Sequence, residues 1–209
     1  MRIVLASASP ARRGILRAAG VDPIVEVAGV DEDALLATLA CASPGERVTA
    51  LAAAKAAVVA RRVGALHPDA VVIGCDSMLH VDGELVGKPV DEPRARARWL
   101  RMAGRCGALV TGHAVLRLSG GDVDRVAEGA ATTTVRFADP DPAELDAYLR
   151  TGEPLAVAGG FTLDGYGGWF VDGIDGDPSN VVGLSLPLVR RLLAEVGVRV
   201  SDLWNLNSR

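Results

Sequence analysis

The sequence predicts a mixed α/β fold, in which a sheet with flanking helices carries a site at its strand ends. Three observations predict this class. Short apolar runs typical of buried strands alternate with helical stretches in the first half of the chain. A hairpin signal, Asp82-Gly83, stands near the middle, and further helical stretches follow towards the C-terminus. The chain has 209 residues without an internal repeat or a linker, so we expect one domain, residues 1–209, large enough for two lobes.

Helix start and stop signals divide the first third of the chain. Ser9 is a good N-cap, Pro10 fits the first helical position, and Gly20 ends the helix that they begin. We expect strands at residues 2–6 and 23–28, and a long alanine-rich helix at residues 46–63.

The rest of the chain contains one further strand-rich region and several helices. The apolar run Val71-Val72-Ile73 is typical of a buried strand, which we expect to end at residues 74–77. The Asp82-Gly83 turn follows it. We expect strands at residues 109–116, 130–137 and 169–171, and helices at residues 91–103, 140–149, 178–182 and 184–197.

Composition excludes several classes of protein. The net charge of −4 gives no general reason to bind nucleic acid or an anionic membrane. The three cysteines, Cys41, Cys75 and Cys106, form no CxxC pair, which argues against a disulfide framework and a structural zinc site. We find no signal peptide and no apolar run of the roughly 20 residues that span a bilayer. We therefore expect a cytoplasmic protein.

The central stretch, residues 71–96, carries the main candidate site. Asp76 and Ser77 follow the apolar strand, and Lys88 lies in the stiff loop Gly87-Lys88-Pro89. A carboxylate and an ammonium on one rigid hairpin make a metal and phosphate site, although an aspartate before a turn is also a common structural feature. A P-loop is excluded, because the spacing is one residue short and Pro89 stands where Ser or Thr would hold magnesium.

A second candidate site lies at the start of the first helix. Ser7 and Ser9 offer hydroxyls beside free backbone amides, and Arg12 and Arg13 stand in the first turn, where the helix dipole disfavours cations. An anion such as phosphate would explain this arrangement. The alternative is a solvated helix start with incidental arginines.

Three further features leave alternatives open. The acidic run at residues 31–33, which includes Glu32, either caps a helix or binds a metal. Lys55 is the only charge in a long apolar stretch of its helix, and it either snorkels to solvent or points into a cleft. The glycine-dense stretch at residues 158–168, which contains Asp164, is either a tight structural turn or a binding loop.

Together these segments resemble the Maf family of nucleotide pyrophosphatases, relatives of the inosine triphosphate pyrophosphatases. Five blocks match in the family's order, and the match runs from residue 2 to about residue 197. The blocks are LASASP at residues 5–10 with the following arginines, VDE at residues 30–32, AAKA at residues 53–56, CDS through GKP at residues 75–89, and GEP through NVVGL at residues 152–184.

The resemblance implies hydrolysis of a nucleoside triphosphate to the monophosphate and pyrophosphate, with a divalent metal such as Mg or Mn. It also implies an elongated, inosine triphosphate pyrophosphatase-like fold with two lobes around a cleft, and a homodimer. The family's proton acceptor falls on Asp76, with Glu32 and Lys88 as further catalytic positions and Glu32 and Asp76 as metal ligands. The substrate-binding positions are Ser7, Arg12, Lys55, Ser77 and Asp164.

Four departures limit what the resemblance implies. Ala11 stands where the family often has Arg, and Ser77 where it usually has Thr. Ala156 and Val157 replace an Asp and a Lys, and Asp164 stands where some members have Gln or Glu. The preferred base therefore stays open. The rival hypothesis is a regulatory module that binds a nucleotide or a partner protein and affects septum formation.

Overall fold

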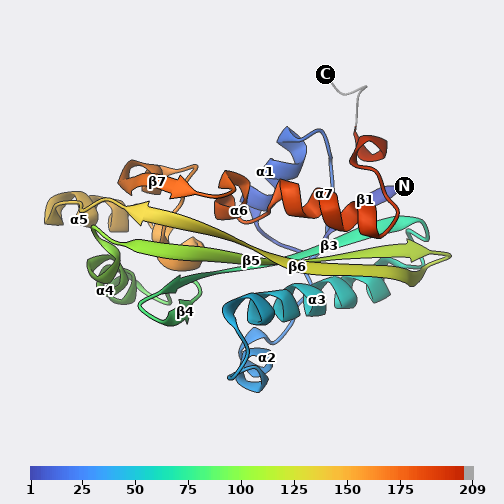
Figure 1. Cartoon of the computed structure of the whole chain (residues 1–209), viewed down its shortest axis with the longest axis horizontal. Coiled ribbons are helices and arrows are strands. Elements are labelled where there is room, and N and C mark those ends of the chain that lie inside the picture. The colour runs from blue at the N-terminus through green and yellow to red at the C-terminus, as the bar shows by residue number, and fades with distance from the viewer. Residues whose placement is uncertain (205–209) are drawn as a thin grey trace. The chain divides into compact units, whose positions relative to one another are not determined.

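The computed structural model, which describes residues 1–204, has the expected mixed α/β class. Its seven-stranded sheet has the order β2-β1-β3-β5-β6-β7, and β4 pairs with β3 (Figure 1). β1 pairs in parallel with β2 and β3, whereas the β3–β4 and β6–β7 pairs are antiparallel. The sheet is therefore mixed, as the sequence predicted.

The elements have the following bounds. The strands are β1 Arg2–Leu5, β2 Ile24–Val25, β3 Ala70–Val81, β4 Glu84–Val86, β5 Cys106–Ser119, β6 Asp122–Phe137 and β7 Val171–Asp175. The α-helices are α1 Pro10–Ala18, α2 Glu32–Thr38, α3 Pro44–Val63, α4 Glu92–Met102, α5 Pro142–Arg150, α6 Pro178–Val182 and α7 Leu186–Glu195. The 3₁₀ helices are η1 Glu153–Ala156, η2 Ala158–Gly160, η3 Tyr166–Phe170 and η4 Val200–Leu203.

The chain divides into two compact units. Unit 1 contains Met1–Asp76, Thr111–Ala131 and the chain from Gly183 onward, and unit 2 contains Ser77–Val110 and Thr132–Val182. Strands β3, β5 and β6 each contribute residues to both units. Asp76 is the last residue of unit 1 along β3, so each unit has its own set of candidate site residues.

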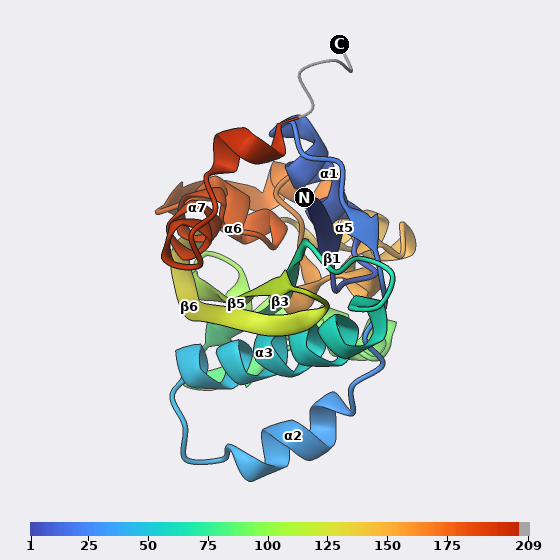
Figure 2. The same ribbon diagram turned by 90° about the vertical axis from the view of Figure 1, so that its right-hand side faces the viewer.

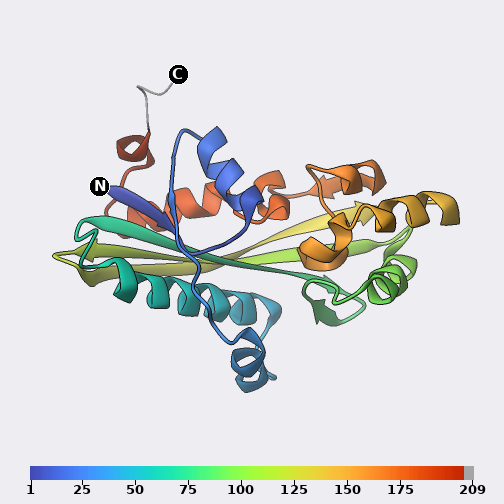
Figure 3. The ribbon, with the colours of Figure 1, turned by 180° about the vertical axis from the view of Figure 1, so that it is seen from behind.

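Unit 1 has helices on both faces of its strands. α3 lies on one face, and α1 and α7 lie on the other (Figures 2 and 3). Successive residues of β1 point to opposite faces, so Ile3 and Leu5 join the core cluster that contains Leu16 and Leu188. Val4 joins the cluster beneath α3. A strand buried on both faces explains the continuous apolar run at residues 3–6.

Close contact between α3 and β3 depends on a glycine. A Cβ atom added at Gly74 would lie 2.2 Å from the carbonyl oxygen of Ala52 and 2.9 Å from the Cβ of Ala56. The alanine-rich face of α3 and the bare backbone of Gly74 therefore allow the helix to approach the strand, and this approach brings Lys55 to the strand that carries Asp76.

Unit 2 is built around a buried aromatic cluster. Trp99 of α4 is fully buried and makes edge-to-face contacts with Phe137, Tyr148 and Phe170. Its indole N–H donates to the carbonyl of Gly160 over 2.8 Å. This cluster fastens α4 and α5 to the glycine-rich stretch of the same unit.

The predicted helix starts lie within two residues of the observed ones. Ser9 caps α1 with Pro10 in the first turn, and Asp31 caps α2, so the capping alternative for the acidic run is confirmed at Asp31. α3 begins at Pro44, two residues before the predicted start, because Ser43 and Glu46 form a capping box.

Several strand boundaries were wrong. β3 does not end at residues 74–77 but continues to Val81, because no residue before the Asp82-Gly83 turn breaks the strand. Asp76 therefore lies inside a strand, not at its end. β5 and β6 are longer than predicted, and β2 has only two residues. Trp169 and Phe170 belong to η3, so the strand predicted at residues 169–171 begins only at Val171.

Among the residues that the structure describes, no helix combines the length and the apolar composition needed to cross a bilayer.

We predict that Gly74→Ala destabilises the fold, because the added methyl group would overlap the backbone of α3. The expected loss is about 1–3 kcal/mol in the free energy of unfolding, measured by chemical denaturation. Gly14→Ala is the matched control, because nothing lies within 4 Å of an added Cβ there. It should stabilise α1 by up to about 1 kcal/mol. Equal stability of the Gly74→Ala variant and the parent would contradict this packing.

Candidate functional site

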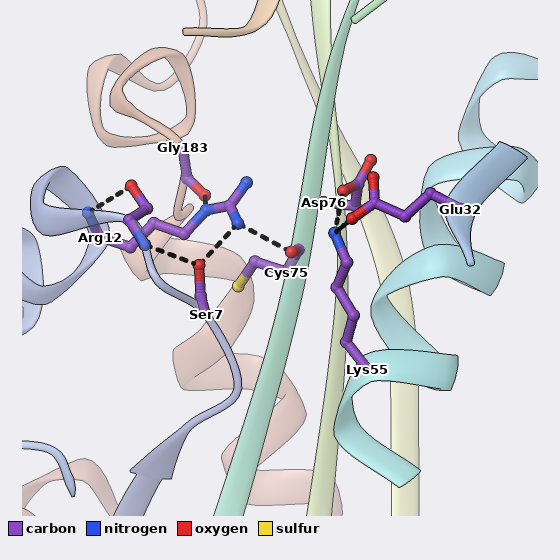
Figure 4. A network of polar contacts seen from close by, with 8 residues as sticks. Ser7, Arg12, Glu32, Lys55, Cys75, Asp76 and Gly183 are labelled. Carbon is purple, nitrogen blue, oxygen red and sulfur yellow. Dashed lines mark hydrogen bonds and ion pairs between the residues drawn. The ribbon is translucent and has the colours of Figure 1, made fainter. Parts of the chain in front are cut away.

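The centre of the candidate site is a cluster of Glu32, Lys55 and Asp76 in unit 1 (Figure 4). The ammonium nitrogen of Lys55 lies 2.5 Å from Oδ1 of Asp76 and 2.7 Å from Oε1 of Glu32. Each residue comes from a different element. Lys55 extends from the middle of α3, Asp76 lies on β3, and Glu32 is the first residue of α2. One cation therefore joins two carboxylates that are far apart in the sequence.

Asp76 is a buried carboxylate. Only 7% of the residue is exposed, and burial raises its pKa above the ordinary value, although Lys55 and Arg12 act in the opposite direction. A raised pKa means that folding disfavours the ionised form. Asp76 therefore lowers stability progressively as the pH rises from its ordinary pKa to its raised folded pKa, and the cost stays constant above that. A carboxyl group whose pKa is shifted by burial and by neighbouring charges is typical of a functional site.

A second group of contacts surrounds Arg12. Its Nε donates to the carbonyl of Gly183 over 2.8 Å, and its Nη1 donates to the carbonyl of Cys75 over 2.8 Å and to Oγ of Ser7 over 3.1 Å. Ser7 is itself buried, and its hydroxyl also accepts the backbone N–H of Ser9. The guanidinium is thus held by three parts of unit 1.

Consecutive residues of β3 connect the two groups. Arg12 contacts the backbone of Cys75, whereas Lys55 contacts the side chain of Asp76, and the two cations lie on either side of β3 (Figure 4). Burial raises the pKa of the Cys75 thiol to about 11, so the thiol stays protonated near neutral pH and is a poor nucleophile.

The structure brings five of the predicted site residues together in unit 1, namely Ser7, Arg12, Glu32, Lys55 and Asp76. The snorkelling alternative for Lys55 was wrong, and the alternative that it points into a cleft stays a prediction. Lys55 pairs with carboxylates, and its side chain is only 13% exposed. Ser77, Lys88 and Asp164 belong to unit 2, and their role at this site stays a prediction.

The loop that carries Lys88 is fastened within unit 2. The carbonyl of Gly87 accepts a hydrogen bond from Nη1 of Arg98 over 2.6 Å and another from the backbone N–H of Gly159 over 3.1 Å. Burial lowers the pKa of Arg98, and the neighbouring Arg101 adds to this shift. Lys88 therefore extends from a loop with two fixed backbone contacts.

Glu153 organises the loop that carries Asp164. Its carboxylate accepts hydrogen bonds from the hydroxyls of Thr162 and Tyr148 and from two backbone N–H groups, those of Tyr166 and Gly167. Burial pushes the pKa of Glu153 upward, but these hydrogen bonds outweigh burial, so the net pKa lies below its ordinary value. The loop is therefore a tight structural turn, and the binding role of Asp164 stays a prediction.

Glu32 and Asp76 have the chemistry to hold a divalent metal. Mg²⁺ prefers carboxylate oxygens, and it is often bound by one or two carboxylates together with substrate phosphates. Two carboxylates on one cation fit that arrangement. No group of three or more His, Cys, Asp or Glu side chains suited to a metal occurs within residues 1–204.

Sequence reasoning missed three contributors to these contacts. Two are backbone carbonyls, those of Cys75 and Gly183, and a carbonyl has no signal of its own because every residue has one. The third is Glu153, which stands in a matched block but was not among the predicted site residues. Its signal was the loop of small residues that follows at residues 158–168.

The Maf-like protein family model matches residues 2–196. The chain belongs to this family. A Saccharopolyspora erythraea relative named nucleoside triphosphate pyrophosphatase is 63% identical, over 98% of this chain and 97% of the relative. A Nocardia farcinica relative with the same name is 61% identical, over 99% of this Maf-like chain and 98% of the relative.

Likeness to solved structures is more distant. The Staphylococcus aureus Ham1 protein matches with a TM-score of 0.38 and 18% identity, over 66% of this chain and 73% of that chain. A nucleoside-triphosphatase, or dITP/XTP pyrophosphatase, from Mycobacterium abscessus matches with a TM-score of 0.33 and 16% identity, over 75% of this chain and 96% of that chain.

We predict that acid weakens unit 2 through Glu153. Its folded pKa is lowered, so its contribution to stability is present above the ordinary pKa and is lost as the pH falls through the folded value. Glu153→Gln should cost on the order of 1–2 kcal/mol at pH 7 and much less near pH 3, as measured by urea unfolding. Glu144→Gln, which removes an exposed capping carboxylate of α5, is the control for the loss of a carboxylate elsewhere in unit 2. A pH-independent cost in the Glu153→Gln variant would contradict the role of its charge.

Proposed function

We propose that this Maf-like chain hydrolyses nucleoside triphosphates to the monophosphate and pyrophosphate. The observation that carries the proposal is Asp76, a buried carboxylate whose Oδ1 lies 2.5 Å from the ammonium of Lys55. The names of relatives that cover nearly the whole chain support the same reaction. A regulatory module is not favoured, because a protein that only binds a nucleotide does not need a buried carboxylate with a raised pKa.

Asp76 is the proposed proton acceptor. Water adds to one phosphorus of the α–β anhydride, the anhydride bond breaks, and the proton passes from the water to the Asp76 carboxylate. A raised pKa suits this task, because a base is most effective when its pKa is near the working pH. Lys55 holds the carboxylate in one orientation through the ion pair.

The cations of unit 1 are the proposed counter-charges for the phosphates. Phosphoryl transfer requires charge neutralisation and positioning more than covalent chemistry. Arg12 and Lys55 lie on either side of Asp76, and the hydroxyl of Ser7 lies beside Arg12. Together these groups would bind a triphosphate across β3. Lys88, Ser77 and Asp164 complete the proposal from unit 2, with Lys88 on phosphate and Asp164 on the base.

A divalent metal, Mg or Mn, is part of the proposal. Glu32 and Asp76 would hold it, and it would supply Lewis-acid stabilisation of the phosphate charge. The ammonium of Lys55 pairs with both carboxylates, and its single positive charge offsets part of the repulsion between them.

Three further features complete this proposal. The proposed substrates are non-standard or surplus nucleotides, the proposed compartment is the cytoplasm, and the proposed assembly is a homodimer. Sedimentation of the purified chain tests the assembly independently of its activity.

We predict that the chain releases pyrophosphate from a panel of nucleoside triphosphates, and that Asp76→Asn lowers kcat by roughly two to four orders of magnitude. The Asn side chain keeps the shape of Asp but cannot accept the proton. Because ionised Asp76 costs stability, the variant should melt at or above the parent's temperature at pH 7 in the presence of a chelator.

Asp22→Asn is the matched control, because it removes an exposed carboxylate of the same unit whose ion pair is with Arg17. It should keep full activity. Near-normal turnover in a folded Asp76→Asn variant would remove Asp76 from the mechanism. The absence of pyrophosphate release from every triphosphate in the panel would contradict the proposed function itself.

A further inference from the structure

His113 is a buried titratable residue that the proposed chemistry does not use. It lies on β5 within unit 1, and no part of it is exposed. Its Nε2 accepts the backbone N–H of Ser185 over 2.9 Å, and its Nδ1 lies 3.1 Å from the carbonyl of Thr111. The ring thus joins β5 to a segment some 70 residues later in the chain.

These two contacts fix the state of the ring. A backbone N–H can only donate, so Nε2 must be the accepting nitrogen of a neutral imidazole. Nδ1 then carries the hydrogen and donates it to Thr111. A side chain without an acceptor at the Nε2 position would leave the Ser185 N–H unpaired in the core.

Ser185 is the residue from which α7 begins. Its hydroxyl accepts the backbone N–H of Leu188, and its carbonyl accepts that of Val189. Two residues earlier stands Gly183, which has a φ of 121°, a conformation that favours glycine. The carbonyl of Gly183 accepts Nε of Arg12 over 2.8 Å, and the intervening Leu184 is fully buried. The turn at residues 183–185 is therefore held by His113 at one end and contacts Arg12 at the other.

We propose that His113 is a positioning residue for Arg12, acting through the Gly183–Ser185 turn. The inference rests on the proposed function, in which Arg12 binds phosphate. His113 touches no substrate in this scheme. It fixes the N–H of Ser185, the turn then presents the Gly183 carbonyl, and that carbonyl orients the guanidinium at its Nε. The contacts of Arg12 with Ser7 and Cys75 are made through its Nη1, whereas the Gly183 carbonyl binds its Nε.

The expected effect depends on the accepting nitrogen of His113, Nε2, and not on the volume of its ring. An unpaired buried N–H costs about 1–3 kcal/mol, which the chain can avoid by moving the turn until the N–H finds another partner. Such a movement displaces the Gly183 carbonyl and loosens Arg12. Loss of ring volume alone would instead lower stability through a cavity and leave the turn in place.

Three substitutions separate these effects. His113→Leu removes both contacts and should raise KM for a triphosphate roughly 10-fold, which corresponds to one hydrogen bond to a charged group, with less effect on kcat. His113→Gln places an amide oxygen near the Nε2 position and should restore KM to within about threefold of the parent. Leu118→Ala, at a fully buried position of the same strand, is the control that lowers the melting temperature without changing KM.

Coupling to Arg12 is the decisive readout. In an Arg12→Lys background, His113→Leu should produce no further rise in KM, because the effect passes through Arg12. Hydrogen exchange should show that the Ser185 amide is protected in the parent and in His113→Gln but not in His113→Leu. A normal KM in His113→Leu, with a melting temperature reduced as in Leu118→Ala, would reduce His113 to a core residue and overturn the inference. So would KM losses that add fully in the double variant.

Two provisions keep this test independent of folding and of the proposed function. If His113→Leu does not fold, His113→Asn replaces it, since Asn keeps a donor for Thr111 but lacks the Nε2 acceptor. If the parent releases no pyrophosphate, the proposed function fails. Calorimetric binding of inorganic pyrophosphate and exchange at Ser185 then decide the inference. Unchanged pyrophosphate affinity in His113→Leu would overturn it.

Discussion

The ion pair between Lys55 and Asp76 is the interaction on which the rest of the site depends. A carboxylate that is only 7% exposed would be strongly disfavoured without a neighbouring cation. Lys55 supplies this cation from the middle of α3, and it also neutralises Glu32. Lys55 is the partner that is hard to replace, because its removal leaves the buried charge of Asp76 without this ion pair.

The packing of α3 against β3 in unit 1 makes this ion pair possible. α3 must approach β3 closely, and it does so over Gly74 and the small side chains Ala52 and Ala56. Successive residues of β3 then serve opposite sides, so that the backbone of Cys75 binds Arg12 while the side chain of Asp76 binds Lys55. Neighbouring residues of β3 therefore contact the two cations, which lie on either side of the strand (Figure 4).

Local rules predicted the helices well and the strands less well. Helix starts depend on a capping side chain within a few residues, so Ser9, Asp31, Asp91 and Asp141 are visible in the sequence. Strand ends depend on pairing partners that lie far away in the chain. β3 therefore continues through Asp76 to Val81, although the sequence shows a glycine and two polar residues where we expected it to end.

The site was predictable to the extent that the family motifs contain it. Resemblance gave Ser7, Arg12, Glu32, Lys55 and Asp76, and the structure brings these five residues together within unit 1. The sequence could not predict that Lys55 pairs with both carboxylates, because this depends on the packing of α2 and α3 against β3. Nor could it reveal contacts made by the backbone of Gly183 or by the buried ring of His113, since neither has a local signature.

The most direct test of this account is a double-mutant cycle on kcat/KM for pyrophosphate release, with Lys55→Met and Asp76→Asn alone and combined. If Lys55 acts by holding and charging Asp76, the two losses are strongly non-additive, and the double variant is about as impaired as the worse single variant. If the losses multiply, Lys55 and Asp76 act independently, and the ion pair is not the centre of the site.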